Sequence, residues 1–359
     1  MHDLMVIGAG PVGSFLASLC SKSMEVAVLE EHKEAGNKPC SGLVSDRLKK
    51  ILPREVIDSP GLIQHEVKGA KIHIMDDVIE LGKRGTAAYI IDRDVLDKRL
   101  AQHAASSGCE MIFGDAAKTI SVLHDRVRIN SEKRSYESKI LAGCDGARSV
   151  VARHINSAPQ ELLNGLIAIE KKENRSDQVE MWFDRRLVSD GFFWTIPRGS
   201  ETEYGAMGSG INFSHLEKFF GLARNGIAEK SAAPIPMGIV KTISERILLV
   251  GDSACQTKPW SGGGITYGML SAKVASRVLI KAVEKDDLGK EDFSEYENGW
   301  KKLLIKDIAC GMVLRELFKD LEGGMIGEVL KSLPLLKAAG ESIDFDFPFS
   351  SLLSDVLKK

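Results

Sequence analysis

The sequence opens with a short apolar run that ends in a glycine turn. Residues Asp3–Ile7 precede Gly8-Ala-Gly10-Pro-Val-Gly13, and a stretch with helical spacing of apolar residues follows. The first glycine of such a turn permits the bend from strand to helix, the second lets the backbone approach a pyrophosphate, and the third allows close helix packing. Glu30 ends a second short strand, where an acid accepts hydrogen bonds from a ribose. The pattern predicts a βαβ unit that binds a dinucleotide.

Two later stretches of the sequence predict binding of the same ligand. Asp145-Gly146 follows one apolar run, and Gly251-Asp252 ends another, where an Asp can bond to a polyol chain. Gly262-Gly-Gly264-Ile265 then opens the longest helical pattern, and the backbone N–H groups there favour negative charge. Each stretch alone also fits an ordinary turn or a capped helix. Together with the first turn they predict FAD as the cofactor.

Composition narrows the class of protein. Among 359 residues, 43% are hydrophobic and 27% charged, as in ordinary globular proteins, and a formal net charge of −2 gives no electrostatic basis for nucleic-acid binding. The six cysteines show no C-x-x-C pair, so we expect neither a metal site nor a disulfide framework. No secretory signal precedes the glycine turn and no apolar run has spanning length. We expect a cytoplasmic protein that meets a membrane, if at all, from its surface.

The remaining pattern divides the dinucleotide fold into separated pieces. We predict helices over 43–52, 94–106 and 265–285, a hairpin over 67–81, and paired strands over 122–129 and 135–142. Strand-like runs dominate 165–212 and predict an antiparallel sheet. The FAD-binding domain is therefore expected over 1–65, 92–157 and 237–290, a β-sheet substrate domain over 66–91 and 158–236, and a helical C-terminal region over 291–359.

These motifs, in this order, resemble the family of FAD-dependent geranylgeranyl reductases, within the larger group of hydroxylase-like flavoproteins. The likeness spans residues 1 to about 285 and is carried by the segments 8–13, 38–42, 89–97, 144–149, 192–199 and 250–265. It implies an α/β fold with an α+β insertion: a Rossmann-like FAD-binding domain, an antiparallel sheet and a helical end. Archaeal members of the family saturate the isoprenoid chains of membrane ether lipids. Plant and bacterial members reduce the geranylgeranyl tail of chlorophyll or of its precursor alcohol.

The resemblance also implies roles for single residues. FAD contacts are implied at Gly13, Glu30, Cys40, Ser41, Gly42, Arg93, Ala116, Asp252, Gly264 and Ile265. Trp194 and Pro197 would shape an apolar tunnel beside the flavin ring, together with Phe192, which stands where the family usually has tyrosine. Cys40 is the candidate proton donor, although a free cysteine also fits an inert core position. The cysteine loop is about one residue shorter than in many archaeal members.

Several alternatives remain open from the sequence. The expected partners are an isoprenoid lipid and an electron donor, and the lack of a second dinucleotide fingerprint leaves a ferredoxin-like carrier and NAD(P)H equally open. The stretch 192–197 also resembles a halogenase motif, so a monooxygenase or halogenase of the same fold group is a second reading. A flavin-bearing lipid carrier or redox sensor is a third. The apolar segment 345–359 with its Lys-Lys end fits either peripheral membrane contact or packing on its own domain.

Overall fold

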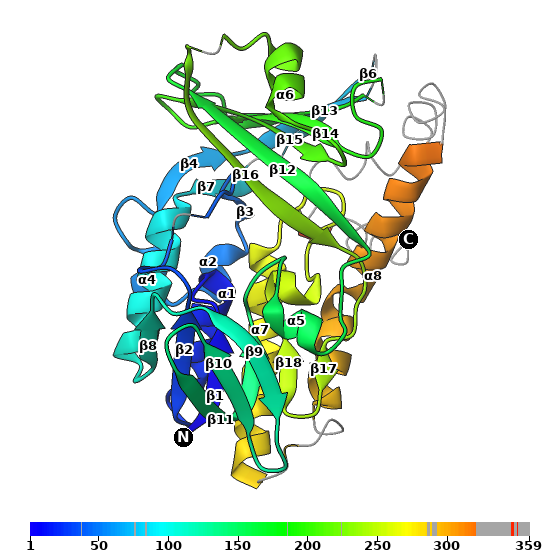
Figure 1. The fold of residues 1–359 in the computed structure, drawn as a ribbon. Coiled ribbons are helices and arrows are strands. Elements are labelled where there is room, and N and C mark those ends of the chain that lie inside the picture. The colour runs from blue at the N-terminus through cyan, green and yellow to red at the C-terminus, as the bar shows by residue number, and fades with distance from the viewer. Residues whose placement is uncertain are drawn as a thin grey trace, which may run out of the picture.

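The structure is a computed structural model that describes residues 1–36, 38–74, 77–82, 85–184, 186–223, 225–285, 288, 293–320, 346–347 and 350. It contains two large sheets that lie one above the other in Figure 1, and helix α8 (Ser294–Asp320), the longest described helix, runs along the side of both. The lower sheet has eight strands and the upper sheet seven. The predicted α/β class with a sheet insertion is confirmed.

The eight-stranded sheet forms around the βαβ unit that the glycine turn predicts. Its path runs in the order β17-β18-β11-β1-β2-β8, and β9 and β10 extend it from β11. The strands are β1 (His2–Ile7), β2 (Val26–Glu30), β8 (Glu110–Phe113), β9 (Ala117–Val122), β10 (Val127–Ser131), β11 (Ser135–Gly143), β17 (Ile243–Ser244) and β18 (Ile247–Leu249). Five of them, β18, β11, β1, β2 and β8, pair in parallel with one another in that order, which requires crossover connections between them.

Helices on one face of this sheet bury its largest apolar cluster. They are α1 (Pro11–Cys20), α4 (Arg93–Ser106), α7 (Ile265–Lys285) and α8 (Ser294–Asp320). The predicted helices at 94–106 and 265–285 are confirmed, and Asp92 caps α4 by accepting hydrogen bonds from the N–H groups of Asp94 and Val95. The other face is covered by β9, β10 and the short α5 (Val150–His154).

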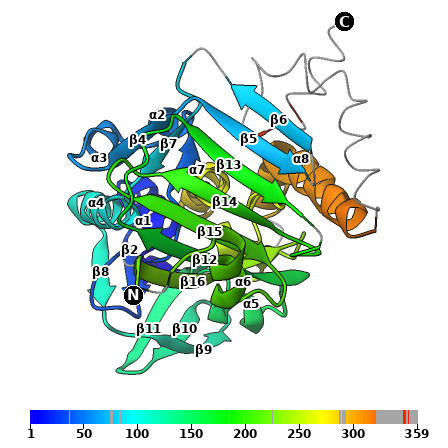
Figure 2. The same cartoon turned by 90° about the horizontal axis from the view of Figure 1, so that it is seen from above.

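The seven-stranded sheet forms the upper layer, whose strands lie side by side in Figure 2. In the order of the sheet they are β16 (Ile227–Met237), β12 (Glu161–Glu170), β15 (Thr202–Gly208), β14 (Phe192–Pro197), β13 (Gln178–Phe183), β5 (Gly69–Ile74) and β6 (Asp77–Gly82). The predicted hairpin is present as β5 and β6, while its turn lies outside the described residues. Neighbours are antiparallel except β13 and β5, which are parallel because β5 arrives from a distant insertion rather than through a hairpin. Helix α6 (Phe213–Phe220) packs on the outer face.

Two predicted elements differ from the structure. The strand predicted over 122–129 begins only at Val127, as β10, which pairs with β11 as predicted. Residues 123–126 form instead the turn between β9 and β10, closed by a hydrogen bond of 2.8 Å from the Leu123 N–H to the Arg126 carbonyl. The helix predicted over 43–52 begins instead as β3 (Leu43–Ser45) and becomes helical only in α2 (Leu48–Ile51). The reason is pairing, because β3, β7 (Ala88–Ile91) and β4 (Ile63–Val67) form a third, three-stranded sheet. Helix α3 (Arg54–Ile57) lies between α2 and β4 in the chain.

The C-terminal end is described only in part. Helix α8 confirms the predicted helical pattern, whereas most of the apolar segment 345–359 lies outside the described residues. Within the part of the chain that the structure describes, no helix combines the length and apolar character needed to cross a bilayer.

Candidate functional site

Three of the predicted motifs follow the ends of three adjacent parallel strands. In the ladder, Ile7 of β1 pairs with Gly143 of β11, which pairs in turn with Leu249 of β18. The turns that begin at Gly8, Cys144 and Val250 therefore leave the sheet at the same edge. Ligands of open α/β sheets bind outside the carboxyl ends of the strands. The fold thus brings together segments that are more than 100 residues apart in the sequence.

The first glycine turn has the geometry of a phosphate cradle. Gly8 has a φ of +101°, and a Cβ there would lie 2.5 Å from the Cys144 carbonyl oxygen, so only glycine fits. A Cβ on Gly13 would overlap the Gly8 carbonyl, which makes that glycine a condition of helix packing. Gly10, in contrast, has no atom within 4 Å of its Cβ position, and it caps α1 without a side-chain hydrogen bond. The open side of the turn and the uncapped N–H groups of α1 fit a pyrophosphate.

Glu30 is held against this turn. Its carboxylate is buried and accepts hydrogen bonds from the Ala9 N–H at 2.7 Å and the His32 N–H at 3.0 Å. A carboxylate has about four lone-pair sites, so acceptor capacity remains for ribose hydroxyls. Ala116 follows β8 beside Glu30, since the adjacent Asp115 N–H donates to the Glu30 carbonyl oxygen. These two predicted residues therefore lie at one end of the candidate site.

Asp252 and the second glycine turn lie against one another. Gly251 begins a short 3-10 helix, and a Cβ on Gly264 would lie 2.5 Å from the Asp252 Oδ1. None of the described residues donates a hydrogen bond to this carboxylate, which leaves it available to the hydroxyls of a ligand. Burial raises the pKa of Asp252, and the cations Arg93 and Lys38 act in the opposite direction. Gly264 and Ile265 open α7, so its first N–H groups face the same region.

The cysteine loop and Arg93 meet beside Asp252. Arg93 donates hydrogen bonds to both oxygens of the buried Asp97, one turn further along α4, and also contacts the Cys40 thiol. Burial opposes the charge of Arg93, but Asp97 and Cys40 outweigh it, so the pKa of Arg93 is raised. The Cys40 Sγ accepts the Gly42 N–H at 3.4 Å. A Cβ on Gly42 would overlap the Ile91 carbonyl, which fixes the loop against β7.

The Asp145 carboxylate forms hydrogen bonds within the protein. It accepts hydrogen bonds from the Ser149 hydroxyl at 2.5 Å and from the Val150 and Val151 N–H groups at 2.6 and 3.2 Å. These bonds begin α5 after the turn. The cofactor contact predicted for Asp145 stays a prediction, whereas its hydrogen bonds to the cap residue Ser149 and to the first N–H groups of α5 are visible.

Two of the predicted tunnel residues, Phe192 and Trp194, lie on the sheet face that meets the second glycine turn. Phe192 is buried and stacks on Phe183 with ring centroids 5.0 Å apart, and Trp194 lies 5.4 Å from Phe192. On the same side, a Cβ on Gly262 would lie 2.9 Å from the Met207 sulfur and 3.1 Å from the Ile235 side chain, so sheet and turn are in contact. Pro197 ends β14 and is buried.

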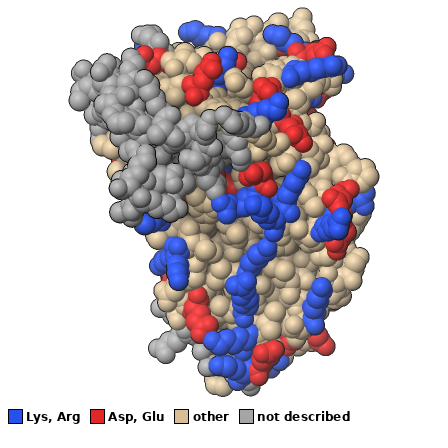
Figure 3. All heavy atoms as spheres, turned by 180° about the vertical axis from the view of Figure 1, so that it is seen from behind, with Lys and Arg blue, Asp and Glu red and all other residues tan. Residues whose placement is uncertain are grey.

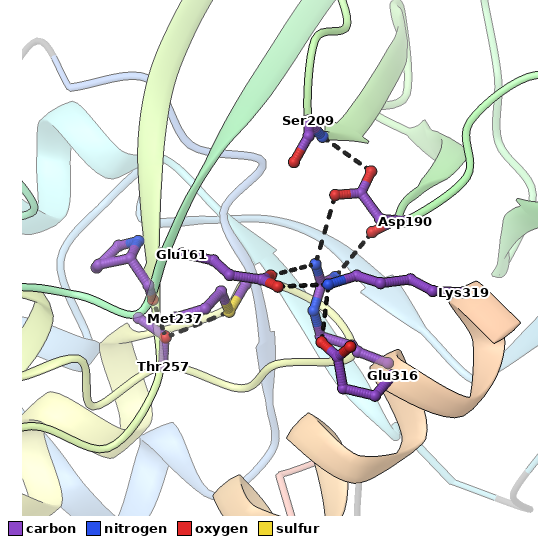
Figure 4. Close-up of polar contacts among 9 residues, drawn as sticks. Glu161, Asp190, Ser209, Met237, Thr257, Glu316 and Lys319 are labelled. Atoms are coloured by element: carbon purple, nitrogen blue, oxygen red, sulfur yellow. Dashed lines mark hydrogen bonds and ion pairs between the residues drawn. The ribbon is translucent and has the colours of Figure 1, made fainter.

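An apolar cavity of about 170 Å³ opens between the sheet, α8 and the loop before α7. Phe192 lines it, whereas Trp194 and Pro197 do not; the other apolar lining residues are Ile72, Ile74, Phe183, Val188, Pro259, Trp260, Leu314 and Phe318. Figure 4 shows the polar cluster next to it, in which Glu161 and Lys319 point toward one another and Asp190 accepts the Ser209 N–H at 2.9 Å. Arg315 donates to the Glu161 carboxylate and to the Asp190 carbonyl, both at 2.9 Å, and so ties α8 to the sheet.

Sequence reasoning did not find a second polar group that joins the cysteine loop to the sheet. Glu203 is fully buried in β15 and accepts hydrogen bonds from the Trp194 Nε1 and the Arg198 Nε, each at 2.9 Å. Arg198 also donates to the Ser41 carbonyl at 2.8 Å. A charged residue within a strand of otherwise small and apolar residues was the available signal. Glu203 and Arg198 thus link Trp194 to the backbone of Ser41, the residue after Cys40.

Comparison with known proteins supports FAD as the cofactor. Residues 1–168 match the family described as FAD binding domain. A digeranylgeranylglycerophospholipid reductase of Methanothrix thermoacetophila is 28% identical and aligns over 92% of this chain and 91% of its own. A structure of a geranylgeranyl bacteriochlorophyll reductase-like protein from Thermoplasma acidophilum has a TM-score of 0.85 at 21% identity, over 100% of this chain and 96% of that one.

A more distant fold neighbour is a halogenase solved in complex with FAD. Its TM-score is 0.71 at 12% identity, and the match covers 96% of this chain and 87% of that one. The likeness to both solved structures is one of fold, whereas the likeness to the archaeal reductases extends to the sequence. Residues 1–168 thus match the FAD binding domain family, and the chain is a FAD-dependent oxidoreductase that resembles the geranylgeranyl reductases.

Proposed function

We propose that this protein saturates C=C double bonds in the isoprenoid chains of a lipid. The observation that supports this reaction is the contact between an apolar sheet face and the glycine turn that opens α7. Met207 and Ile235 pack on Gly262, and Phe192 continues the same face into the cavity beside α8. A chain without polar atoms is the ligand that such walls fit.

The residues around this face would act by position and by exclusion of water. An isolated alkene has no carbonyl that a charged side chain could polarise, so orientation in a dry site is the main contribution open to the protein. Phe192, Phe183 and Trp260 supply rigid apolar walls. The polar cluster of Arg315 and Glu161 closes the side of the cavity next to α8. FAD, when bound and reduced, supplies the hydride that such a saturation requires.

Cys40 is the proposed proton donor. The described structure places its Sγ within reach of Arg93 and of the Gly42 N–H, in the loop that Arg198 fastens to the sheet. We expect C40A and C40S alike to retain FAD and to lose most of their saturating activity, because a serine hydroxyl is a far weaker acid than a thiol. Full activity in C40A with normal FAD content would remove Cys40 from the reaction.

The reaction itself is tested without oxygen. Dithionite-reduced protein is incubated with an unsaturated digeranylgeranyl lipid and, separately, with geranylgeranyl diphosphate, and the products are read by mass spectrometry for added pairs of hydrogens. Hydrogenated lipid over many turnovers supports the proposal. Oxygen consumption coupled to substrate loss would favour the monooxygenase or halogenase reading instead. Lipid binding without any turnover would favour a carrier or sensor.

A lipid substrate also requires a route to the membrane surface, and the electron donor must reach the flavin. Helix α7 carries Lys273, Arg277, Lys281 and Lys285 at a spacing of four residues, which puts them on one helix face. Figure 3 shows a band of Lys and Arg down this side of the molecule. We propose that the band contacts anionic headgroups, at about 1 kcal/mol for each cation near the surface.

The membrane contact is measured by flotation with anionic and neutral vesicles. We expect salt-sensitive binding to anionic vesicles that weakens in R277E/K285E but not in K118E, which changes an exposed lysine on the distant strand β9. Unchanged flotation of R277E/K285E would refute the contact. Loss of reduction by an acidic ferredoxin, with flotation intact, would assign the band to the electron donor.

A further inference from the structure

A buried ion pair lies against the glycine turn that opens α7. Lys258 and Asp346 are 8% and 0% exposed, and the Lys258 Nζ lies 2.9 Å from the Asp346 Oδ1. Taking two charges out of water costs several kcal/mol for each ion. Neither residue is among the FAD contacts predicted from the sequence. The free-energy cost of burying this ion pair therefore needs an explanation.

The position of Lys258 is fixed by the turn itself. Its N–H donates to the Gly263 carbonyl at 3.0 Å, and its own carbonyl accepts the Gly262 N–H at 2.8 Å. The side chain then folds back over the turn, so that a Cβ on Gly263 would lie 2.8 Å from Lys258 Cε and 3.2 Å from Nζ. The ammonium group therefore stands beside the first N–H groups of α7, and its charge adds to the positive end of the helix.

Asp346 reaches this place from the far end of the chain. Its carboxylate accepts a hydrogen bond from the Ser45 hydroxyl, and its carbonyl accepts one from the Tyr267 hydroxyl at 2.7 Å. Phe347 stacks on the Tyr267 ring with centroids 5.4 Å apart, and the Arg47 guanidinium lies 4.9 Å above the Phe347 ring. These contacts hold the carboxylate on the side of Lys258 that faces β3 and α7.

We propose that Lys258 is a cofactor-binding residue whose charge stabilises reduced FAD, and that Asp346 is the counter-ion that limits this effect. The proposal rests on the location of the flavin ring at the second glycine turn, as in the proposed function. Two-electron reduction places negative charge on the flavin, which a nearby ammonium favours and a nearby carboxylate disfavours. Loss of either partner should therefore shift the flavin potential, in opposite directions.

The test uses the FAD-loaded protein and two near-isosteric variants. K258Q removes the cation and keeps a hydrogen-bonding group for Asp346, and D346N removes the anion in the same way. We expect K258Q to lower the affinity for reduced relative to oxidised FAD about tenfold, which is about 30 mV for a two-electron couple. D346N should raise the ratio by a similar factor. K258Q/D346N should return to within about threefold of the parent protein.

Controls separate this electrostatic role from a structural one. K258R keeps the charge and should keep the potential, and K118Q, which changes an exposed lysine on the distant strand β9, should also leave it unchanged. Thermal unfolding of the apoprotein shows whether each variant folds. If the pair were only a clamp, K258Q and D346N would weaken both redox forms alike and leave the potential unchanged. That result, or shifts of the same sign in both variants, would overturn the proposal, whereas a lack of lipid saturation would bear only on the proposed function.

Discussion

Replacement of Glu30 by glutamine tests the first glycine turn at two levels. The carboxylate accepts hydrogen bonds from the Ala9 and His32 N–H groups, at 2.7 and 3.0 Å, on different oxygens. Glutamine keeps one acceptor oxygen and turns an NH₂ group toward the other donor. Hydrogen bonds to charged groups contribute about 1.5–3 kcal/mol, so E30Q should lower the free energy of unfolding of the apoprotein by about this amount.

E30Q should also weaken FAD binding by a comparable free energy, because we predict that the ribose hydroxyls of FAD donate hydrogen bonds to the Glu30 carboxylate. A loss of about 1.5–3 kcal/mol corresponds to a rise in Kd of about 10- to 150-fold. Denaturant unfolding of the apoprotein and titration of FAD fluorescence measure the two effects. E31Q is the matched control, since the neighbouring Glu31 side chain is 62% exposed. An E30Q protein that binds FAD as tightly as E31Q would refute the assignment.

Three further outcomes are expected. In G205A the new methyl group would overlap the Trp194 ring, so we expect a shift in tryptophan emission and a stability loss of about 1–3 kcal/mol; an unchanged spectrum would contradict the packing. Burial works against the charge of Glu161, but its two cationic partners on α8 hold its pKa below the usual 4.5. The stability that this carboxylate contributes is therefore full above that pH and lost as the pH falls through the lowered value, and E161Q should show a flatter acid limb in denaturant unfolding. Burial raises the pKa of the Cys20 thiol to about 12, so a thiol reagent at pH 8 should spare Cys20 and modify the half-buried Cys40. Bound FAD should protect Cys40 from the reagent. Equal labelling with and without FAD would argue against a place for Cys40 in the site.

Local rules predicted the parts of the fold that local geometry decides. The glycine turns at Gly8 and Gly251 need backbone conformations or close approaches that only glycine allows, so their signal is present in a few adjacent residues. The cap of α4 and the start of α7 are of the same kind. Asp145 shows the limit of such rules, because an Asp-Gly turn fits a ligand contact, whereas the structure shows its carboxylate bonded to the start of α5.

Strands and contacts that depend on distant partners were not predicted. β16 contains Pro234 and Pro236, which lack an N–H and ordinarily argue against a strand. It exists because it lies at the edge of its sheet and pairs only with β12. The segment that begins at Leu43 likewise became a strand through pairing with β7 rather than through its own pattern.

The polar bridge of Arg198 and Glu203, and the Lys258–Asp346 pair, join residues far apart in the chain. No spacing rule connects such residues. The sequence therefore predicted the glycine-lined cradle better than the walls that surround it, since the walls are made by tertiary contacts.

The interleaving of the two large sheets has a consequence for synthesis on the ribosome. The upper sheet takes β5 and β6 from residues 69–82 and its other strands from 161–237, while the lower sheet is completed only by β18 at 247–249. An emerging chain therefore holds unpaired strand edges until about two thirds of it has been made. Such edges can pair with other nascent chains. Neither layer can be expected to mature as an autonomous fragment, and chaperone demand should fall once β18 has left the exit tunnel.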